Sequence, residues 1–240
     1  MGIVRKMISN LTLDFIYFCA KLSRKSPAKC QEERWAWTDA RSIRNDEKVL
    51  FVDLGSNLGQ GYRWFRRYFR APNVAFELFE PNPNCLEELE KLDDVSKAKV
   101  KLYPWGVGMS EGWFDFYGLH EDEGGKYSQG GSLVKNHNSD RYEPSEQATI
   151  KVKVINFSSY LKDKSTEFDK IIVKMDIEGA EVELLEGLLR ENTINLIDTL
   201  YVEFHSQYQI EELAASTKTR EDNILRDLSN ETHVNVRIWH

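Results

Sequence analysis

The sequence predicts an α/β protein with a doubly wound parallel sheet. From Val49 onward, strand-like runs alternate with helix-like runs, which is typical of a parallel sheet covered by helices. The first strand also ends in a glycine-bearing loop, as in nucleotide-binding folds. The expected strands are 49–53, 74–80, 99–104, 113–117, 149–155, 170–175, 197–204 and 233–239, and the first expected helices are 58–70 and 83–92. We expect the last strand to be an antiparallel closing strand.

The chain of 240 residues, 41% of them hydrophobic, is long enough for one sizeable core. Residues 1–46 are expected to form an N-terminal helical extension that is broken near Ser26 and Pro27. Residues 47–240 then form the larger domain. Within it, the polar, glycine-containing stretch 118–148 shows little periodicity, and we expect a lid or an acceptor-binding loop there, with plain disorder as the alternative.

Charge and cysteine content exclude several classes of protein. A formal net charge of −7 argues against a nucleic-acid partner. The three cysteines form no CxxC pair, which favours a reducing compartment and hence the cytoplasm. The fairly apolar run 7–22 carries Asn10 and Asp14 and is shorter than a membrane span, so we expect an amphipathic helix and no stable membrane insertion.

The most informative run is VLFVDLGSNLGQG, residues 49–61. A dinucleotide fold needs a second glycine two residues after the first, and Asn57 occupies that position here. Asp53, at the strand end, would repel a pyrophosphate but suits a ligand with an ammonium and a sulfonium group. The loop therefore favours S-adenosylmethionine (SAM) over NAD.

Glu80 ends the second strand, FELFE. An acid at this place in a doubly wound sheet can accept hydrogen bonds from both hydroxyls of an adenosine ribose. We therefore predict that Glu80 binds ribose; Glu77 is the weaker candidate, and a surface carboxylate is the alternative reading of Glu80.

The segment IIVKMDIEGAEVELLEGLL, residues 171–189, carries a second group of acids. Asp176 and Glu178 follow a buried strand, where acids line the cleft of an open sheet, whereas Glu181 and Glu183 read as capping acids. His205 follows the next strand, LYVEFH. Asp176 and His205 are the candidate general bases, Glu203 is a weaker one, and all four of Asp176, Glu178, Glu203 and His205 could instead gather a divalent cation.

Three blocks, VDLGSNLGQ, FEPNPN and VKMDIEGAEVELLEG, together resemble the FkbM family of class I SAM-dependent methyltransferases, over about residues 49–205. The resemblance implies a seven-stranded, Rossmann-like methyltransferase sheet and methyl transfer from SAM to an acceptor oxygen, often a sugar hydroxyl. By position, it implies a methionine site at Asp53, Gly55, Ser56, Asn57 and Gly59, a ribose site at Glu80 and Pro81, an adenine site at Trp105, Gly106 and Val107, and a cofactor or acceptor contact at Ser132.

Two other classes of function stay open. The chain could be a non-catalytic module that keeps the fold and binds a partner, although the ligand-facing acids Asp53 and Glu80 favour an enzyme. It could also methylate protein or RNA, which the acidic balance disfavours. The preferred hypothesis is an O-methyltransferase acting on a glycan or another small hydroxylated acceptor.

Overall fold

The computed structural model describes residues 26–96, 100–118, 130–135, 137, 149–209 and 211–239. The chain divides into two compact units. The smaller unit runs through Arg44 and includes Trp239, and the larger unit is Asn45–Ile238. The described helices are α2 (Pro27–Arg41), α3 (Gln60–Phe65), α4 (Pro83–Glu90), α5 (Asp93–Ser96), α6 (Phe157–Lys164), α7 (Glu181–Arg190) and α8 (Glu211–Glu231), with 3₁₀ turns η1 (Thr193–Leu196) and η2 (Ser206–Tyr208).

The described part of the smaller unit is built on α2. The helix begins where the sequence predicts a break, because Ser26 is its N-cap and accepts a hydrogen bond from the Lys29 backbone N–H at 3.3 Å. Pro27 occupies the first helical position, where its missing N–H costs nothing. The Lys29 ammonium lies 5.3 Å from the centre of the Trp239 ring. Residues 1–25 of the expected N-terminal extension lie outside the described residues.

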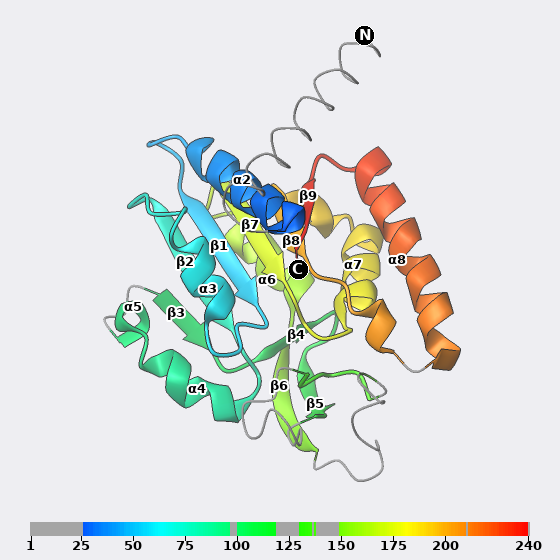
Figure 1. The fold of residues 1–240 in the computed structure, drawn as a ribbon. Coiled ribbons are helices and arrows are strands. Elements are labelled where there is room, and N and C mark those ends of the chain that lie inside the picture. The colour runs from blue at the N-terminus through cyan, green and yellow to red at the C-terminus, as the bar shows by residue number, and fades with distance from the viewer. Residues whose placement is uncertain are drawn as a thin grey trace. The chain divides into compact units, whose positions relative to one another are not determined.

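The larger unit contains a parallel six-stranded sheet (Figure 1). Its order is β3-β2-β1-β7-β8-β9, that of a doubly wound nucleotide-binding fold. The strands are β1 (Val49–Leu54), β2 (Val74–Phe79), β3 (Val100–Tyr103), β7 (Lys170–Met175), β8 (Thr199–Val202) and β9 (Asn235–Ile238).

Two details of the predicted sheet are wrong. The sheet has six strands in the described residues, not seven, because the expected strands at 113–117 and 149–155 pair with each other elsewhere. The last strand is also not antiparallel: β9 runs parallel to β8, in register from Thr199 with Asn235 to Val202 with Ile238. The long helix α8 makes this possible, since a parallel neighbour needs a crossover of such length.

The two faces of the sheet pack differently, because side chains alternate along each strand. On one face, Phe65 of α3 packs against Phe51 and Tyr201, with ring centres 4.8 and 4.7 Å apart. On the other, aliphatic residues of the central strands pack with α6, α7 and α8, as with Val173, Leu185 and Leu228. Both faces are thus covered, which explains why every residue of β1 is buried.

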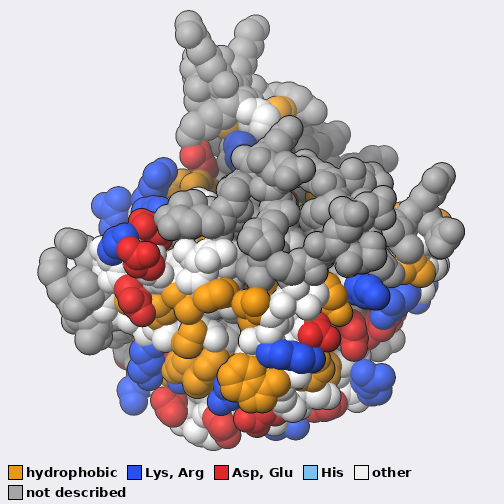
Figure 2. Space-filling view, turned by 90° about the horizontal axis from the view of Figure 1, so that it is seen from below, with side chains coloured by type: hydrophobic (Ala, Val, Ile, Leu, Met, Phe, Trp, Pro, Cys, Tyr) orange, Lys and Arg blue, Asp and Glu red, His pale blue; other side chains and the backbone are white. Residues whose placement is uncertain are grey.

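A separate three-stranded sheet joins β4 (Gly106–Gly108), β6 (Ile150–Asn156) and β5 (Gly112–Phe116), in the order β4-β6-β5. β5 carries two of the exposed large hydrophobic side chains, Trp113 (70% exposed) and Phe114 (40%). Figure 2 views the molecule from below, the end at which Figure 1 places this sheet, and shows hydrophobic side chains gathered among charged ones.

Most of the expected lid, 118–148, lies outside the described residues; Gly118, 130–135 and His137 are described. Ser132 pairs with Tyr117 in an isolated antiparallel β-bridge, and His137 pairs with Gln209 in another. Among the helices of the described residues, none is long and apolar enough to cross a membrane.

Candidate active site

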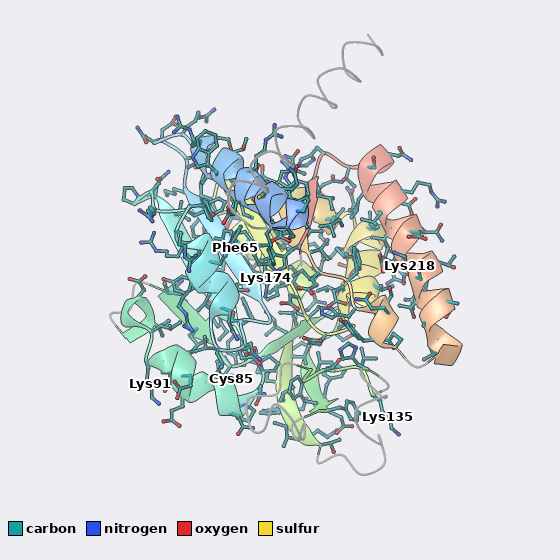
Figure 3. All side chains as sticks on the ribbon, in the orientation of Figure 1. Phe65, Cys85, Lys91, Lys135, Lys174 and Lys218 are labelled. Atoms are coloured by element: carbon teal, nitrogen blue, oxygen red, sulfur yellow. The ribbon has the colours of Figure 1, made fainter. Side chains whose placement is uncertain are left out.

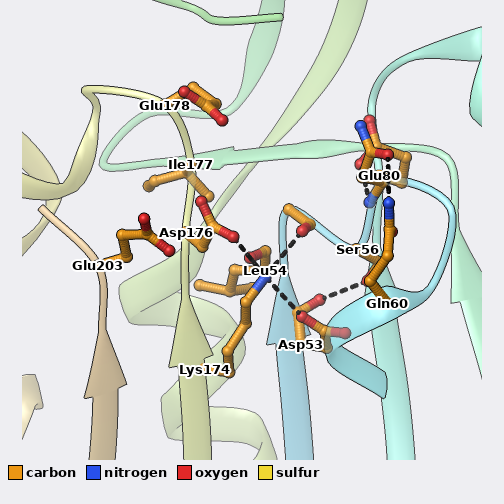
Figure 4. Close-up of polar contacts among 12 residues, drawn as sticks. Asp53, Leu54, Ser56, Gln60, Glu80, Lys174, Asp176, Ile177, Glu178 and Glu203 are labelled. Carbon is orange, nitrogen blue, oxygen red and sulfur yellow. Dashed lines mark hydrogen bonds and ion pairs between the residues drawn. The ribbon is translucent and has the colours of Figure 1, made fainter. Parts of the chain in front are cut away.

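The candidate site lies at the carboxyl ends of four neighbouring strands. The loops after β1, β2, β7 and β8 meet at this edge, and the strand order switches here: β2 and β3 lie on one side of β1, and β7, β8 and β9 lie on the other, all parallel. In open α/β sheets, ligands bind at such a switch point. Figure 4 shows Glu80 on the β2 side and Asp176, Glu178 and Glu203 on the β7 and β8 side of the loop that follows β1.

The loop after β1 needs its glycines. Gly55 has φ +72°, and a Cβ there would lie 1.8 Å from the backbone oxygen of Asp176, so a side chain cannot fit. Gly59 has φ +82° and precedes the first turn of α3. Asn57 takes a left-handed conformation as well, with φ 46°, which Asn tolerates better than most residues. The loop is thereby drawn close to the end of β7.

Glu80, directly after β2, binds the backbone of this loop. Its Oε2 accepts the backbone N–H of Asn57 at 2.6 Å, and its Oε1 accepts that of Asn82 at 2.8 Å. The side chain is buried, and burial raises the pKa of Glu80 to about 7 despite these hydrogen bonds. Each carboxylate oxygen has a further lone pair, so Glu80 can still accept a ribose hydroxyl while it holds the loop.

Asp53 is fully buried and lies opposite Lys174 in the register of β1 and β7. The Lys174 ammonium lies 3.1 Å from Asp53 Oδ1 and 3.1 Å from Asp176 Oδ2, and it donates to the Gly55 carbonyl at 2.9 Å. A Cβ on Gly61 would touch both Asp53 and Lys174, so the first turn of α3 covers the pair. Burial raises the pKa of Asp53, and the ammonium opposes that rise.

Asp53 therefore forms an ion pair with Lys174 and is not exposed to solvent. The sequence predicts that Asp53 faces the charged end of a cofactor, whereas the geometry gives it a role in holding the loop through Lys174. Lys174 is itself buried, and Figure 3 shows it among the strands, whereas Lys91 and Lys218 lie at the periphery.

Asp176, Glu178 and His205, three of the four residues that the sequence offers as possible cation ligands, lie close together. One potential ligand atom from each lies within 4.8 Å of the others. His205 Nε2 is 3.6 Å from Asp176 Oδ1 and 3.6 Å from Glu178 Oε2, whereas Glu203 Oε1 is more distant, at 4.0 Å. We call Asp176, Glu178 and His205 the carboxylate–histidine cluster. The carboxylates are partly exposed and the imidazole is buried, so the cluster opens to solvent from one side.

Glu181 orients His205. Its Oε1 lies 2.9 Å from His205 Nδ1 and also accepts the backbone N–H groups of Ile177 and Gly179, at 3.0 and 3.2 Å. Burial lowers the pKa of His205, but Glu181, Glu178 and Asp176 together raise it to about 9. Glu181 thus caps the turn as the sequence indicates, and it also directs His205 Nε2 toward the cluster.

Two residues of the described part of 118–148 hold Glu178. His137 Nε2 lies 2.8 Å from Glu178 Oε2, and the Ser132 hydroxyl donates to the Glu178 carbonyl at 2.5 Å. Glu178 has φ 53°, an uncommon conformation for a residue other than glycine. Ser132, predicted as a cofactor or acceptor contact, is therefore in position to fix the backbone that presents Glu178.

The predicted adenine and ribose residues lie near one another. Gly106 and Val107 belong to β4, directly after Trp105, and a Cβ on Gly106 would lie 3.8 Å from the Cβ of Pro81. The Glu80 backbone N–H donates to the Tyr103 carbonyl at 3.1 Å, which ties the end of β2 to the end of β3. These contacts place the start of β4 beside the residue that follows Glu80.

Lys174 and the orienting role of Glu181 are not predicted from the sequence. The signal for Lys174 is a single cation in the otherwise apolar strand IIVKM, since a buried lysine needs an acidic partner. No comparable signal marks Glu181, because an acid in the first turn of a helix is common.

Together, the strand order and the glycine loop at the switch point define a doubly wound α/β protein, and the acids there form its candidate site. Residues 53–231 match the family described as methyltransferase FkbM domain, and the chain belongs to this family. Membership implies SAM as the methyl donor.

Two relatives are similar at a distance. The chain is 24% identical over 185 residues to the hexuronic acid methyltransferase AglP of Haloferax volcanii, covering 73% of this chain and 67% of that protein. A crystal structure of methyltransferase FkbM from Methylobacillus flagellatus KT is 14% identical, with a TM-score of 0.38; the match covers 75% of this chain but only 38% of that one.

Proposed function

We propose that the chain is a SAM-dependent O-methyltransferase that acts on a hydroxyl of a sugar, in a glycan or a small molecule. The observation that carries the proposal is the arrangement across the switch point: Glu80 lies on one side of the loop after β1, and the carboxylate–histidine cluster lies on the other. A nucleoside bound at Glu80 would extend its reactive end toward the cluster.

The residues present fit the cofactor. Glu80 is a buried carboxylate with further lone pairs for ribose hydroxyls, and it lies beside the glycine-bearing loop that follows β1. Pro81 and the Trp105–Val107 stretch lie together beside Glu80 and would line the adenine. SAM supplies an electrophilic methyl group when bound.

The cluster supplies what an alcohol acceptor needs. Methyl transfer is an in-line displacement, so much of the acceleration comes from positioning the acceptor oxygen. The hydroxyl proton must also leave during the attack, and a positioned base commonly contributes ~10²–10⁴-fold. Asp176 is the group placed to accept that proton directly, whereas His205, with a pKa of about 9, would first have to lose its own proton. A divalent cation held by the same residues would instead acidify the hydroxyl.

The choice of a sugar acceptor is supported by the relative AglP, which is named for methylation of hexuronic acid. The net charge of −7 disfavours RNA as the acceptor.

The first experiment is calorimetric titration with S-adenosylhomocysteine (SAH), the product of SAM. We expect Glu80→Ala to weaken SAH binding at least tenfold, about 1.4 kcal/mol, because the ribose loses its acceptor. Glu90→Ala is the matched control, since Glu90 is an exposed acid of the neighbouring helix α4. The second step is transfer from labelled SAM to neutral sugars and to uronic acids.

A folded chain that fails to bind SAH at millimolar concentration would contradict the enzyme and leave a non-catalytic module. SAH binding with transfer to a protein or RNA, but to no sugar, would contradict the proposed acceptor alone.

A further inference from the structure

We propose that Asp176, Glu178 and His205 bind a divalent metal ion that accepts both carboxylate and imidazole ligands, such as Mn²⁺. The buried imidazole directs its Nε2 at two carboxylates from 3.6 Å, beyond hydrogen-bonding distance. A cation about 2.1 Å from each atom fits a gap of that size. The gap between these ligand atoms is the observation on which the proposal rests.

Each of the three residues is held by a partner. Lys174 binds Asp176 through Oδ2 and leaves Oδ1 facing His205. Glu181 binds His205 through Nδ1 and leaves Nε2 facing the carboxylates. In metal sites, a carboxylate that binds the second nitrogen of a histidine ligand fixes the orientation of the imidazole and raises its basicity as a ligand.

Glu178 is held through its backbone and its side chain. Ser132 binds its carbonyl, and His137 lies 2.8 Å from the same Oε2 that faces His205. A Cβ on Gly179 would meet the side chains of both His137 and Gln209, so the turn that carries Glu178 is closely packed. The carboxylate is thus positioned before any cation binds.

The ligand types limit the choice of metal. Two carboxylates and one imidazole suit a first-row ion such as Mn²⁺ or Zn²⁺ better than Mg²⁺ or Ca²⁺, which prefer oxygen ligands alone. Acidic side chains outnumber basic ones at this edge: Lys174 lies between Asp53 and Asp176, and Glu178, Glu181 and Glu203 lie around His205. A divalent ion would neutralise that excess.

Three protein ligands leave coordination positions open, as in catalytic metal sites. The side chains of Asp176 and Glu178 are 25% and 20% exposed, so an acceptor can reach the ion from the solvent side. The role of the ion in the reaction rests on the proposed function. The ion would bind the acceptor hydroxyl, lower the pKa of that hydroxyl and orient it.

The test is Mn²⁺ binding, measured by electron paramagnetic resonance on the full chain after treatment with EDTA. We expect one site, and we expect Glu178→Gln to weaken it at least tenfold. Glu183→Gln is the matched control, because it removes the same charge from an exposed position of α7 and should leave Mn²⁺ affinity unchanged. His205→Gln is the second variant, since it removes the imidazole from the other strand loop.

Thermal melts of each variant establish that it is folded. Absence of a site in the wild-type chain, or equal loss in Glu178→Gln and Glu183→Gln, would overturn the metal proposal. The SAH titration is run without metal, so failure of the metal site with SAH binding and transfer intact leaves the proposed methyltransferase standing. Loss of SAH binding with an intact Mn²⁺ site would overturn the methyltransferase alone.

Discussion

Lys174 lies directly opposite Asp53 on adjacent parallel strands, with the ammonium 3.1 Å from the carboxylate, and both side chains are buried. The same ammonium reaches Asp176, so one lysine connects the ends of β1 and β7. The two strands flank the switch point. This lysine therefore links the loop after β1 to the loop that carries the cluster.

Lys174→Met should destabilise the fold by about 3–5 kcal/mol, because it leaves Asp53 buried without a counter-charge. Urea denaturation measures this loss. In the double variant Asp53→Asn with Lys174→Met, the destabilisation should be smaller than the sum of the two single losses, since the uncompensated charge is gone. Additive losses, or a loss under 1 kcal/mol for Lys174→Met, would show that the pair is not coupled.

Gly55→Ala should displace the loop after β1. The new methyl group would lie 1.8 Å from the Asp176 backbone oxygen, and φ +72° disfavours alanine. We expect a loss of about 2–3 kcal/mol in the free energy of unfolding, together with loss of SAH affinity. Gly108→Ala is a useful comparison, because its nearest contact is a Val154 side chain at 3.2 Å and its φ is unexceptional; it should cost clearly less.

Glu80 should make stability fall as pH rises. Its pKa is about 7 in the folded chain and 4.5 ordinarily, so between these values the folded chain holds a proton that the unfolded chain has released. Stability therefore decreases from about pH 4.5 to pH 7 and is flat above, with a total of about 3 kcal/mol.

Denaturation at pH 5 and pH 8 measures this slope. Glu80→Gln cannot titrate, so its stability should change less with pH. Its overall stability should be lower, because the amide NH₂ group cannot accept the backbone N–H that a carboxylate oxygen accepts. Parallel profiles for the two chains would mean that Glu80 is ionised across the whole range.

His205→Asn should slow methyl transfer without unfolding the chain. Asparagine can still donate to Glu181 from near the Nδ1 position, but it removes the Nε2 that faces Asp176 and Glu178. We expect transfer to fall by ~10²–10⁴-fold and SAH affinity to change little. Transfer assays and calorimetry on the same preparation separate the effect on the transfer rate from the effect on SAH affinity. Transfer near the wild-type rate would show that His205 has no role in the reaction.

His137→Ala should lower the rate of transfer more than it lowers SAH affinity. The substitution removes the contact with the Glu178 carboxylate, whereas Glu80 is held by other residues. We expect a loss of about 10–100-fold in kcat, the range found for partners of site residues. Equal losses in kcat and SAH affinity would indicate a general disturbance of the fold.

The sequence by itself determined the main strands and helices and the strand ends at which the candidate site residues lie. Apolar runs such as that of β1, followed by glycine and acid, are local signals, and each strand end could be located from them. Parallel strands end at one edge, so sequence order already suggested Asp176, Glu178, Glu203 and His205 as one group; the structure brings ligand atoms of the first two and of His205 within 4.8 Å of one another, and their role stays a prediction.

Only the tertiary structure decided how the strands pair and what the charged groups face. Periodicity does not specify a strand's neighbour, so the separation of β5 and β6 into a second sheet and the parallel direction of β9 could not be predicted. Asp53 and Lys174 are 121 residues apart in the sequence, and Glu181 and His205 are 24 residues apart. Only the packing of the sheet brings the side chains of each pair into contact.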